Sequence, residues 1–288
     1  MSSDALRSII LATDFSPRMR AAGRYAGLLA RHYDAELIVA HAFHLQQAAM
    51  EAEELGHVRS RQREQLEHRL SGSVEELALV APKSVSFLGE GDPSDVIDRL
   101  LRQHRPAMIV LGTHGAGTIQ RHIISSLAEG ILRSVTDPVL TVGPHVAMPP
   151  EERLAFGHIL YATDFSQAAA QAACHACEMA RSFGSKLDVL HVVPELTAED
   201  HDGLVAKERQ FLAALGELGR EHAFRSAQMF VESGSAAQRI LEHARAHDVD
   251  LIVLGAHHHS RLARHLRTGP AFQIILRSTC PVLTLCAD

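Results

Sequence analysis

Residues 9–16 read IILATDFS, an apolar run that ends in a short polar turn, and residues 159–166 repeat it as ILYATDFS. Six of the eight positions are identical at an offset of 150 residues. Further along the chain, IVLG at residues 109–112 matches IVLG at residues 252–255 at an offset of 143. Short apolar strands resemble one another by convergence, but collinear blocks with two consistent offsets indicate that one domain has been duplicated.

The composition agrees with two ordinary globular domains. The chain has 288 residues, 46% hydrophobic and 22% charged, so each half is long enough to bury a core of its own. The segment GPHVAMPP at residues 143–150 has the glycine and proline content of a linker. We therefore expect a first domain at residues 1–145 and a second at residues 151–288.

Within one copy, short apolar runs alternate with longer helical patterns. Ser16 before Pro17 and Asp92 before Pro93 have the form of N-caps followed by a first-turn proline, so each predicts the start of a helix. The expected strands of the first copy are residues 8–12, 37–42, 84–88, 108–112 and 139–142. This alternation predicts an α/β fold of two tandem doubly wound domains, each a mainly parallel five-stranded sheet of order 3-2-1-4-5 with helices on both faces.

The residues of unusual type follow the first and fourth strands, where such a sheet binds its ligands. Gly112 and Gly115 allow backbone amides to approach an anion, and Ser126 and the amides of the next helix supply further donors, a lining that suits a triphosphate. Asp14 could accept a hydrogen bond from a ribose hydroxyl, or it could only cap the helix that follows.

These residues resemble the universal stress protein family in its tandem form, over nearly the whole chain. Nucleotide-binding members of that family carry Gly-x2-Gly-x9-Gly-[Ser/Thr], and here the spacing is kept with Ser125 in place of the third glycine. The resemblance implies that the first domain binds ATP or a related adenine nucleotide, with or without Mg, as a non-catalytic stress-response or signalling module. By position, the implied nucleotide-binding residues are Ala12, Thr13, Asp14, Ala42, Leu111, Gly112, His114, Gly115, Ser125, Ser126 and Leu127.

The second copy has kept the aspartate of the motif and lost part of the glycine loop. Residues 255–258 read GAHH, so a histidine side chain stands where backbone should approach a phosphate, and Pro270 removes an amide donor. We expect nucleotide binding mainly in the first domain, with binding lost or altered in the second. The candidate residues of that second site are Asp164, Val192, Gly255, His258 and Gly269.

No metal site is expected, although two patterns contain potential metal ligands. The motif CHAC at residues 174–177 places two sulfurs on one helical face, but no second Cys-x-x-Cys completes a zinc site, and small buried thiols are common. His257, His258 and His259 could bind a transition metal or contact phosphate, yet loop histidines are more often simply solvated.

Several other classes of protein are disfavoured. A net charge of −6 provides no basic surface for nucleic acid. No apolar run approaches the roughly 20 residues that cross a bilayer, and no leader pattern opens the chain, so a cytoplasmic location without membrane contact is expected. Because no P-loop lysine or positioned base is evident, binding is favoured over catalysis. The alternatives are a slow ATPase, or a scaffold with vestigial clefts or with another small ligand or a metal in the second domain.

The last strand of each copy predicts how the two copies assemble. Residues 138–142 and 281–285 read PVLTV and PVLTL, which are apolar edge strands that invite pairing. In the family that the chain resembles, such strands pair between subunits. We therefore expect the two copies to pair with each other as a pseudo-dimer within one chain, and two chains could associate further as a homodimer.

Overall fold

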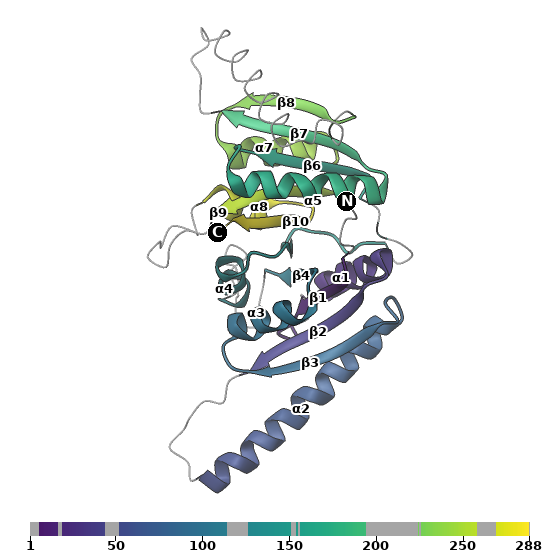
Figure 1. Ribbon diagram of the computed structural model, residues 1–288, viewed down its shortest axis with the longest axis vertical. Helices are drawn as coiled ribbons and strands as arrows, with labels where there is room; N and C mark the ends of the chain where they lie inside the picture. Colours follow the sequence, from purple (N-terminus) through teal and green to yellow (C-terminus); the bar gives the residue numbers. More distant parts are fainter. Residues whose placement is uncertain are drawn as a thin grey trace. The chain divides into compact units, whose positions relative to one another are not determined.

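A computed structural model describes most of the chain, and the residues it covers form two compact units (Figure 1). Unit 1 comprises Met1–Asp137 with Met148–Leu154, and unit 2 comprises Pro138–Ala147 with Ala155–Asp288. The described residues are 6–16, 19–43, 52–113, 126–150, 154, 156–193, 224, 226–257 and 269–287.

Unit 1 holds four parallel strands in the order β3-β2-β1-β4. The strands are β1 (Ser8–Ala12), β2 (Glu36–Phe43), β3 (Ser84–Glu90) and β4 (Ala107–Gly112). The helices are α1 (Met19–Tyr33), α2 (Ala52–Ala78), α3 (Pro93–His104) and α4 (Ser126–Ser134). Right-handed crossovers put α1 and α2 on one face of the sheet and α3 and α4 on the other, and the members of each pair contact one another.

The local signals in the sequence explain where these elements begin. All five residues of β1 are buried, as expected of a central parallel strand that is covered on both faces. At the start of α3, the Asp92 side chain accepts a hydrogen bond from the Ser94 amide at 2.9 Å, and Pro93 occupies the first turn. The predicted strands and the helix after Asp92 are confirmed, with bounds that differ by one or two residues.

The described residues of unit 2 form six strands in the order β5-β10-β9-β6-β7-β8, and all neighbouring pairs are parallel except β5 with β10. The strands are β5 (Val139–Val142), β6 (His158–Thr163), β7 (Lys186–Val193), β8 (Gln228–Ser233), β9 (Leu251–His257) and β10 (Val282–Ala287). The helices are α5 (Gln167–Phe183), α7 (Ala236–Ala246) and α8 (Pro270–Arg277). The second repeat therefore follows the predicted doubly wound order 3-2-1-4-5, and the four strands of unit 1 follow the same order up to the fourth strand.

The strand β5 belongs to the first repeat in sequence and to unit 2 in space. It pairs antiparallel with β10, with Leu140 opposite Leu283, and the Thr284 hydroxyl donates to the Val139 carbonyl at 3.3 Å. The last strands of the two repeats thus pair within one chain, as their apolar sequences suggest. Among the described residues, no helix is both long enough and apolar enough to cross a membrane.

Candidate functional site

The turn after β1 is held by its own side chains. The Phe15 amide donates to Thr13 Oγ1 at 3.0 Å, and the Ser16 amide donates to Asp14 Oδ1 at 2.9 Å. Phe15 has a φ of 60°, in the left-handed region that bulky residues rarely adopt. Threonine and aspartate side chains stabilise such turns by bonding to backbone two residues further on. Asp14 is therefore fixed at the carboxyl end of β1 by a local hydrogen bond.

His41, near the end of β2, supports this turn from beside it. Its Nδ1 lies 2.7 Å from the Thr13 carbonyl, and because a carbonyl only accepts, Nδ1 carries the hydrogen. Burial lowers the pKa of His41, and the Arg69 charge lowers it further, while the hydrogen bond to Thr13 and the charge of Asp14 act in the opposite direction. The Phe15 ring lies 4.4 Å from the imidazole, centroid to centroid. These contacts make His41 a structural support of the turn.

The second repeat reproduces each of these contacts after β6. Phe165 has a φ of 63°, its amide donates to Thr163 Oγ1 at 3.1 Å, and the Ser166 amide donates to Asp164 Oδ1 at 2.9 Å. His191 Nδ1 lies 2.8 Å from the Thr163 carbonyl, and its ring lies 4.6 Å from that of Phe165. Since the aspartate has the same local role in both repeats, any difference in ligand binding must arise from other residues.

The glycines near the carboxyl ends of β4 and β9 lie in close contact with neighbouring helices. A Cβ on Gly112 would lie 2.5 Å from Met19 Sδ, and a Cβ on Gly255 would lie 2.3 Å from the Ala169 nitrogen and 2.5 Å from the Ala168 carbonyl carbon. Helix α5 therefore approaches Gly255 too closely for a side chain, whether or not a phosphate binds there. In the first repeat the obstacle is a flexible side chain, whereas in the second it is helix backbone.

Unit 2 contains a cavity of about 190 Å³ where ligands of this fold bind. It lies beyond the carboxyl ends of β6, β7 and β9 and reaches the first turns of α7 and α8. Four of the candidate residues of the second site line it together: Asp164, Val192, Gly255 and Gly269. Gly269 is the N-cap of α8 and makes no side-chain capping bond, and the following Pro270 has no amide to donate.

In unit 1 the described candidates gather at the carboxyl edge of the sheet. Ala12 is in register with Leu111 of β4, which brings Thr13 and Asp14 close to Gly112. Ala42 lies near the end of β2, and Ser126 and Leu127 form the first turn of α4. The candidates outside the described residues are His114, Gly115, Ser125, His258 and His259, while His257 is the last residue of β9.

The cysteines of unit 2 are all reduced. Burial raises the pKa of both Cys280 and Cys286 to about 11, so these two thiols are poor nucleophiles at neutral pH. Cys174 Sγ lies 3.8 Å from the Ala170 carbonyl in the turn before it. Within the described part of the chain, neither Cys174 nor Cys177 belongs to a group of three or more potential metal ligands.

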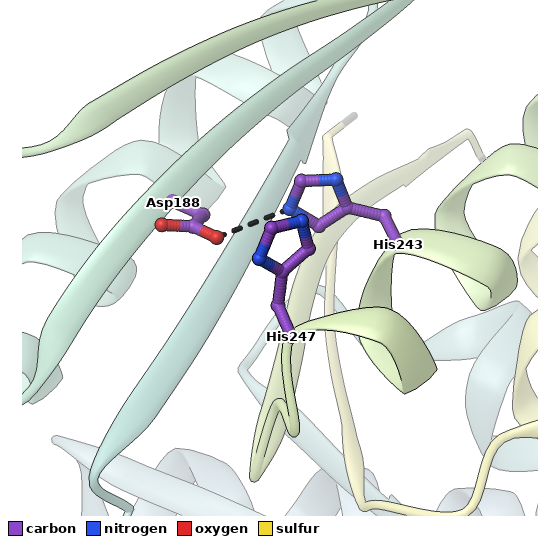
Figure 2. A group of neighbouring side chains, drawn as sticks. All are labelled: Asp188, His243 and His247. Atoms are coloured by element: carbon purple, nitrogen blue, oxygen red, sulfur yellow. Dashed lines mark hydrogen bonds and ion pairs between the residues drawn. The ribbon is translucent and has the colours of Figure 1, made fainter.

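One polar cluster in unit 2 was not anticipated from the sequence. Asp188 of β7 lies against His243 and His247 at the end of α7, with one potential ligand atom of each within 4.8 Å of the others (Figure 2). At the offsets of the repeat, Asp188 corresponds to Ile38 and His243 to Leu100, both buried in unit 1. An aspartate and a histidine in place of two apolar core residues were the signal that could have revealed it.

Comparison with known proteins agrees with the duplicated architecture. The solved structure of a universal stress protein from Archaeoglobus fulgidus covers 98% of this chain and 96% of its own, with a TM-score of 0.70 at 20% identity. A protein from Pseudomonas aeruginosa PAO1 covers 99% of this chain and 94% of its own, with a TM-score of 0.65 at 19% identity. At such identities the likeness shows the fold alone.

Sequence relatives carry the same family name. Universal stress protein Slr1230 from Synechocystis is 29% identical over 185 residues, a match that spans 62% of this chain and 57% of the relative. Universal stress protein C from Salmonella typhi is 31% identical over 121 residues, which are 38% of this chain and 90% of the relative. The sequence model of the universal stress protein family matches residues 5–143 and again residues 155–285. The chain therefore belongs to the universal stress protein family, with two copies of its domain in tandem.

Proposed function

We propose that the first repeat binds ATP or a related adenine nucleotide, with or without Mg, as a non-catalytic stress-response module. The observation that carries the proposal is the position of Asp14, held just beyond the carboxyl end of β1, whose last residue Ala12 is in register with Leu111 of β4. The strand order reverses between β1 and β4, and doubly wound folds bind nucleotides at this reversal. The carboxylate can accept from a ribose hydroxyl, and the Gly112–Ser126 segment has the motif spacing for phosphates.

The second repeat supports a weaker or altered interaction. Its cavity of about 190 Å³ is smaller than the roughly 300–1,000 Å³ of typical small-molecule pockets. Its α8 begins with Pro270, which cannot donate an amide to a phosphate, and His258 replaces a motif glycine. We infer that this cleft accommodates at most the nucleoside part of a nucleotide.

Binding without turnover is the favoured activity. The chain contains no P-loop lysine motif, and the segment from Gly112 to Ser126 offers Arg121 as its single fixed positive charge in the sequence. In the cytoplasm, partner proteins would then respond to whether the first repeat has nucleotide bound, rather than to hydrolysis of the nucleotide. A slow ATPase would be recognised by ADP release that Asp14→Ala abolishes.

The proposal is tested on the full chain with a matched pair of variants, Asp14→Ala and Asp164→Ala. Each removes the same hydrogen bond, at 2.9 Å to the serine amide two residues on, so both should perturb the turn equally. Loss of the hydrogen bond between the carboxylate and the ribose hydroxyl would cost about 1.5–3 kcal/mol of binding free energy, which corresponds to about 10- to 150-fold in affinity for ATP. In ATP titration by calorimetry we expect Asp14→Ala to lose that much and Asp164→Ala to keep the wild-type affinity.

A further variant, Gly115→His, introduces the histidine of the second repeat into the first. We expect it to weaken ATP binding while leaving binding of adenosine much less affected, because the new side chain stands at the phosphate position. Loss of ATP binding in Asp164→Ala but not in Asp14→Ala would overturn the assignment to the first repeat. Absence of ATP binding by the wild-type chain would favour the scaffold alternative.

A further inference from the structure

The polar cluster of Asp188, His243 and His247 is the least expected feature of unit 2. Two more polar side chains adjoin it, those of His158 and Glu232. The side chains of Asp188 and His243 are each only 1% exposed. A buried charge costs several kcal/mol unless it is paired, so such residues are seldom found where an apolar pair would fit. His158 and Asp188 lie in the amino-terminal halves of β6 and β7, and His243 and His247 lie at the C-terminal end of α7, whereas Glu232 lies near the carboxyl end of β8. None of the five lines the cavity at the carboxyl edge.

His243 has more acceptors than a neutral imidazole can satisfy. Its Nδ1 lies 3.1 Å from Glu232 Oε1, and its Nε2 lies 3.1 Å from Asp188 Oδ2. A neutral ring has one N–H, so one of these two nitrogens would point a lone pair at a carboxylate oxygen. The contact is favourable only if a second proton or a cation is present.

His158 has the same problem at the same oxygen. Its Nδ1 lies 2.8 Å from the His247 carbonyl, which only accepts, so the ring hydrogen is on that nitrogen. Its Nε2 is buried and lies 2.9 Å from Asp188 Oδ2, yet it makes no hydrogen bond to that oxygen or to any other atom of the described residues. Two imidazole nitrogens therefore converge on one carboxylate oxygen, with a single proton available to at most one of them in neutral rings. This arrangement calls for additional positive charge.

His247 provides a third potential metal ligand, and its side chain is exposed to solvent. It follows His243 by four residues, the spacing that places two side chains on one face of a helix, and the two rings stack at 4.2 Å. Figure 2 shows both rings turned toward the carboxylate of Asp188. Ligands of a tetrahedral ion lie about 3.3 Å apart for bonds of about 2.0 Å, so donors within 4.8 Å require only small side-chain rotations. The exposed His247 can make that adjustment.

We propose that Asp188, His243 and His247 bind one divalent transition-metal ion, with Zn²⁺ the best match to two imidazoles and a carboxylate. That donor set suits Zn²⁺, and the exposed side of the site leaves a fourth position for water. Glu232 accepts from His243 Nδ1 and thereby directs Nε2 at the ion, as carboxylates beside metal-bound histidines commonly do. The negative end of the α7 dipole adds to the attraction.

The ion would fasten α7 to the sheet. Asp188 belongs to β7, His243 belongs to the last turn of α7 and His247 is the C-cap of that helix, so one ion would join the two elements. The first half of α7 lines the cavity through Ala236 and Ile240. Metal occupancy would therefore order a helix that also forms one wall of the second cleft. Unit 1, with Ile38 and Leu100 in the corresponding places, achieves this contact by apolar packing.

The experiment uses the full chain purified without an affinity tag. After removal of metal by a chelator and incubation with Zn²⁺, the protein is desalted and its zinc content is measured by inductively coupled plasma mass spectrometry. The double variant Asp188→Ile/His243→Leu reproduces the first repeat and should bind one zinc fewer per chain. The triple variant His257→Ala/His258→Ala/His259→Ala controls for zinc held by the histidine loop and should retain the ion of the cluster.

A second variant tests the site without changing a buried residue, in case the double variant fails to fold. His247→Ala changes an exposed residue at the end of α7, and its counterpart in the first repeat, His104→Ala, is the matched control. We expect at least a tenfold loss of Zn²⁺ affinity in His247→Ala and none in His104→Ala, and Glu232→Gln should weaken binding about 10- to 100-fold. If wild type binds no zinc, or if the double variant and His247→Ala bind as wild type does, the cluster is only an internal hydrogen-bonded network and the proposal is refuted.

Discussion

Replacing Gly255 by alanine tests whether the motif glycine of the second repeat is kept by packing. The new Cβ would lie 2.3 Å from the Ala169 nitrogen and 2.5 Å from the Ala168 carbonyl carbon, so α5 would have to retreat by about 1 Å to restore contact distance. Overpacking of a core costs about 1–3 kcal/mol, and backbone obstacles place this variant at the upper end. Alanine recovers about 0.4–1 kcal/mol by restricting the unfolded chain. A net loss of about 2 kcal/mol is expected.

Two other glycines provide the comparison. In Gly112→Ala the obstacle is Met19 Sδ, at 2.5 Å, and a flexible side chain can move, so we expect a loss below about 1 kcal/mol. Gly72 lies within α2 with nothing inside 4 Å of a Cβ, so Gly72→Ala should stabilise unit 1 by about 0.5–1 kcal/mol.

Urea unfolding of the full chain, followed by far-ultraviolet circular dichroism, measures all three variants. Separate transitions for the two units would also show which unit each substitution affects. The reasoning is refuted if Gly255→Ala is as stable as wild type, or if Gly112→Ala costs more than Gly255→Ala. The first result would mean that α5 withdraws freely, and the second would mean that Met19 cannot move.

Three further predictions concern protonation, thiol reactivity and capping. Burial lowers the pKa of His41, so its contribution to the free energy of unfolding is complete above the ordinary pKa of about 6.5 and is lost as the pH falls toward the lowered value. Urea titrations from pH 8 to pH 5 should show this loss in wild type and less of it in His41→Gln. Because burial raises the pKa of Cys280 and Cys286 to about 11, both should react with Ellman's reagent at pH 7.5 only after unfolding, and rapid labelling of either in the native chain would contradict their burial. Asp92→Ala should destabilise unit 1 by about 1 kcal/mol in urea, whereas Ser235→Ala should cost much less because that N-cap makes no side-chain bond; equal losses would refute the capping argument.

The sequence predicted the fold well because the elements are defined by local signals. The apolar run of β1 and the aspartate–proline start of α3 each act within a few residues. The strand order followed from the alternation of strands and helices together with the handedness of crossovers. Asp14 was placed correctly at the carboxyl end of β1, whereas the support of the turn by His41 depends on a contact with Thr13, 28 residues away in the chain. Its role toward nucleotide stays a prediction.

What could not be predicted depends on residues far apart in the chain. The pairing of β5 with β10 was expected, but no local signal shows that β5 belongs to the compact unit of the second repeat. The metal-site prediction considered short Cys and His motifs, whereas Asp188 and His243 are 55 residues apart and come from a strand and a helix. Each alone is an ordinary polar residue. Only the comparison with Ile38 and Leu100 of the first repeat marks both as replacements of buried apolar residues.

The pairing of β5 with β10 has a consequence for how the protein is made. Val139 and Thr284, which are joined by a hydrogen bond, are separated by 145 residues. At about 5–20 residues per second, a ribosome needs roughly 7–30 s to make the intervening chain. During that interval β5 has left the tunnel without its antiparallel neighbour, so its apolar edge is available to chaperones or to the same strand of an adjacent nascent chain. The last strand of the first repeat therefore lacks its antiparallel partner until β10 has been made.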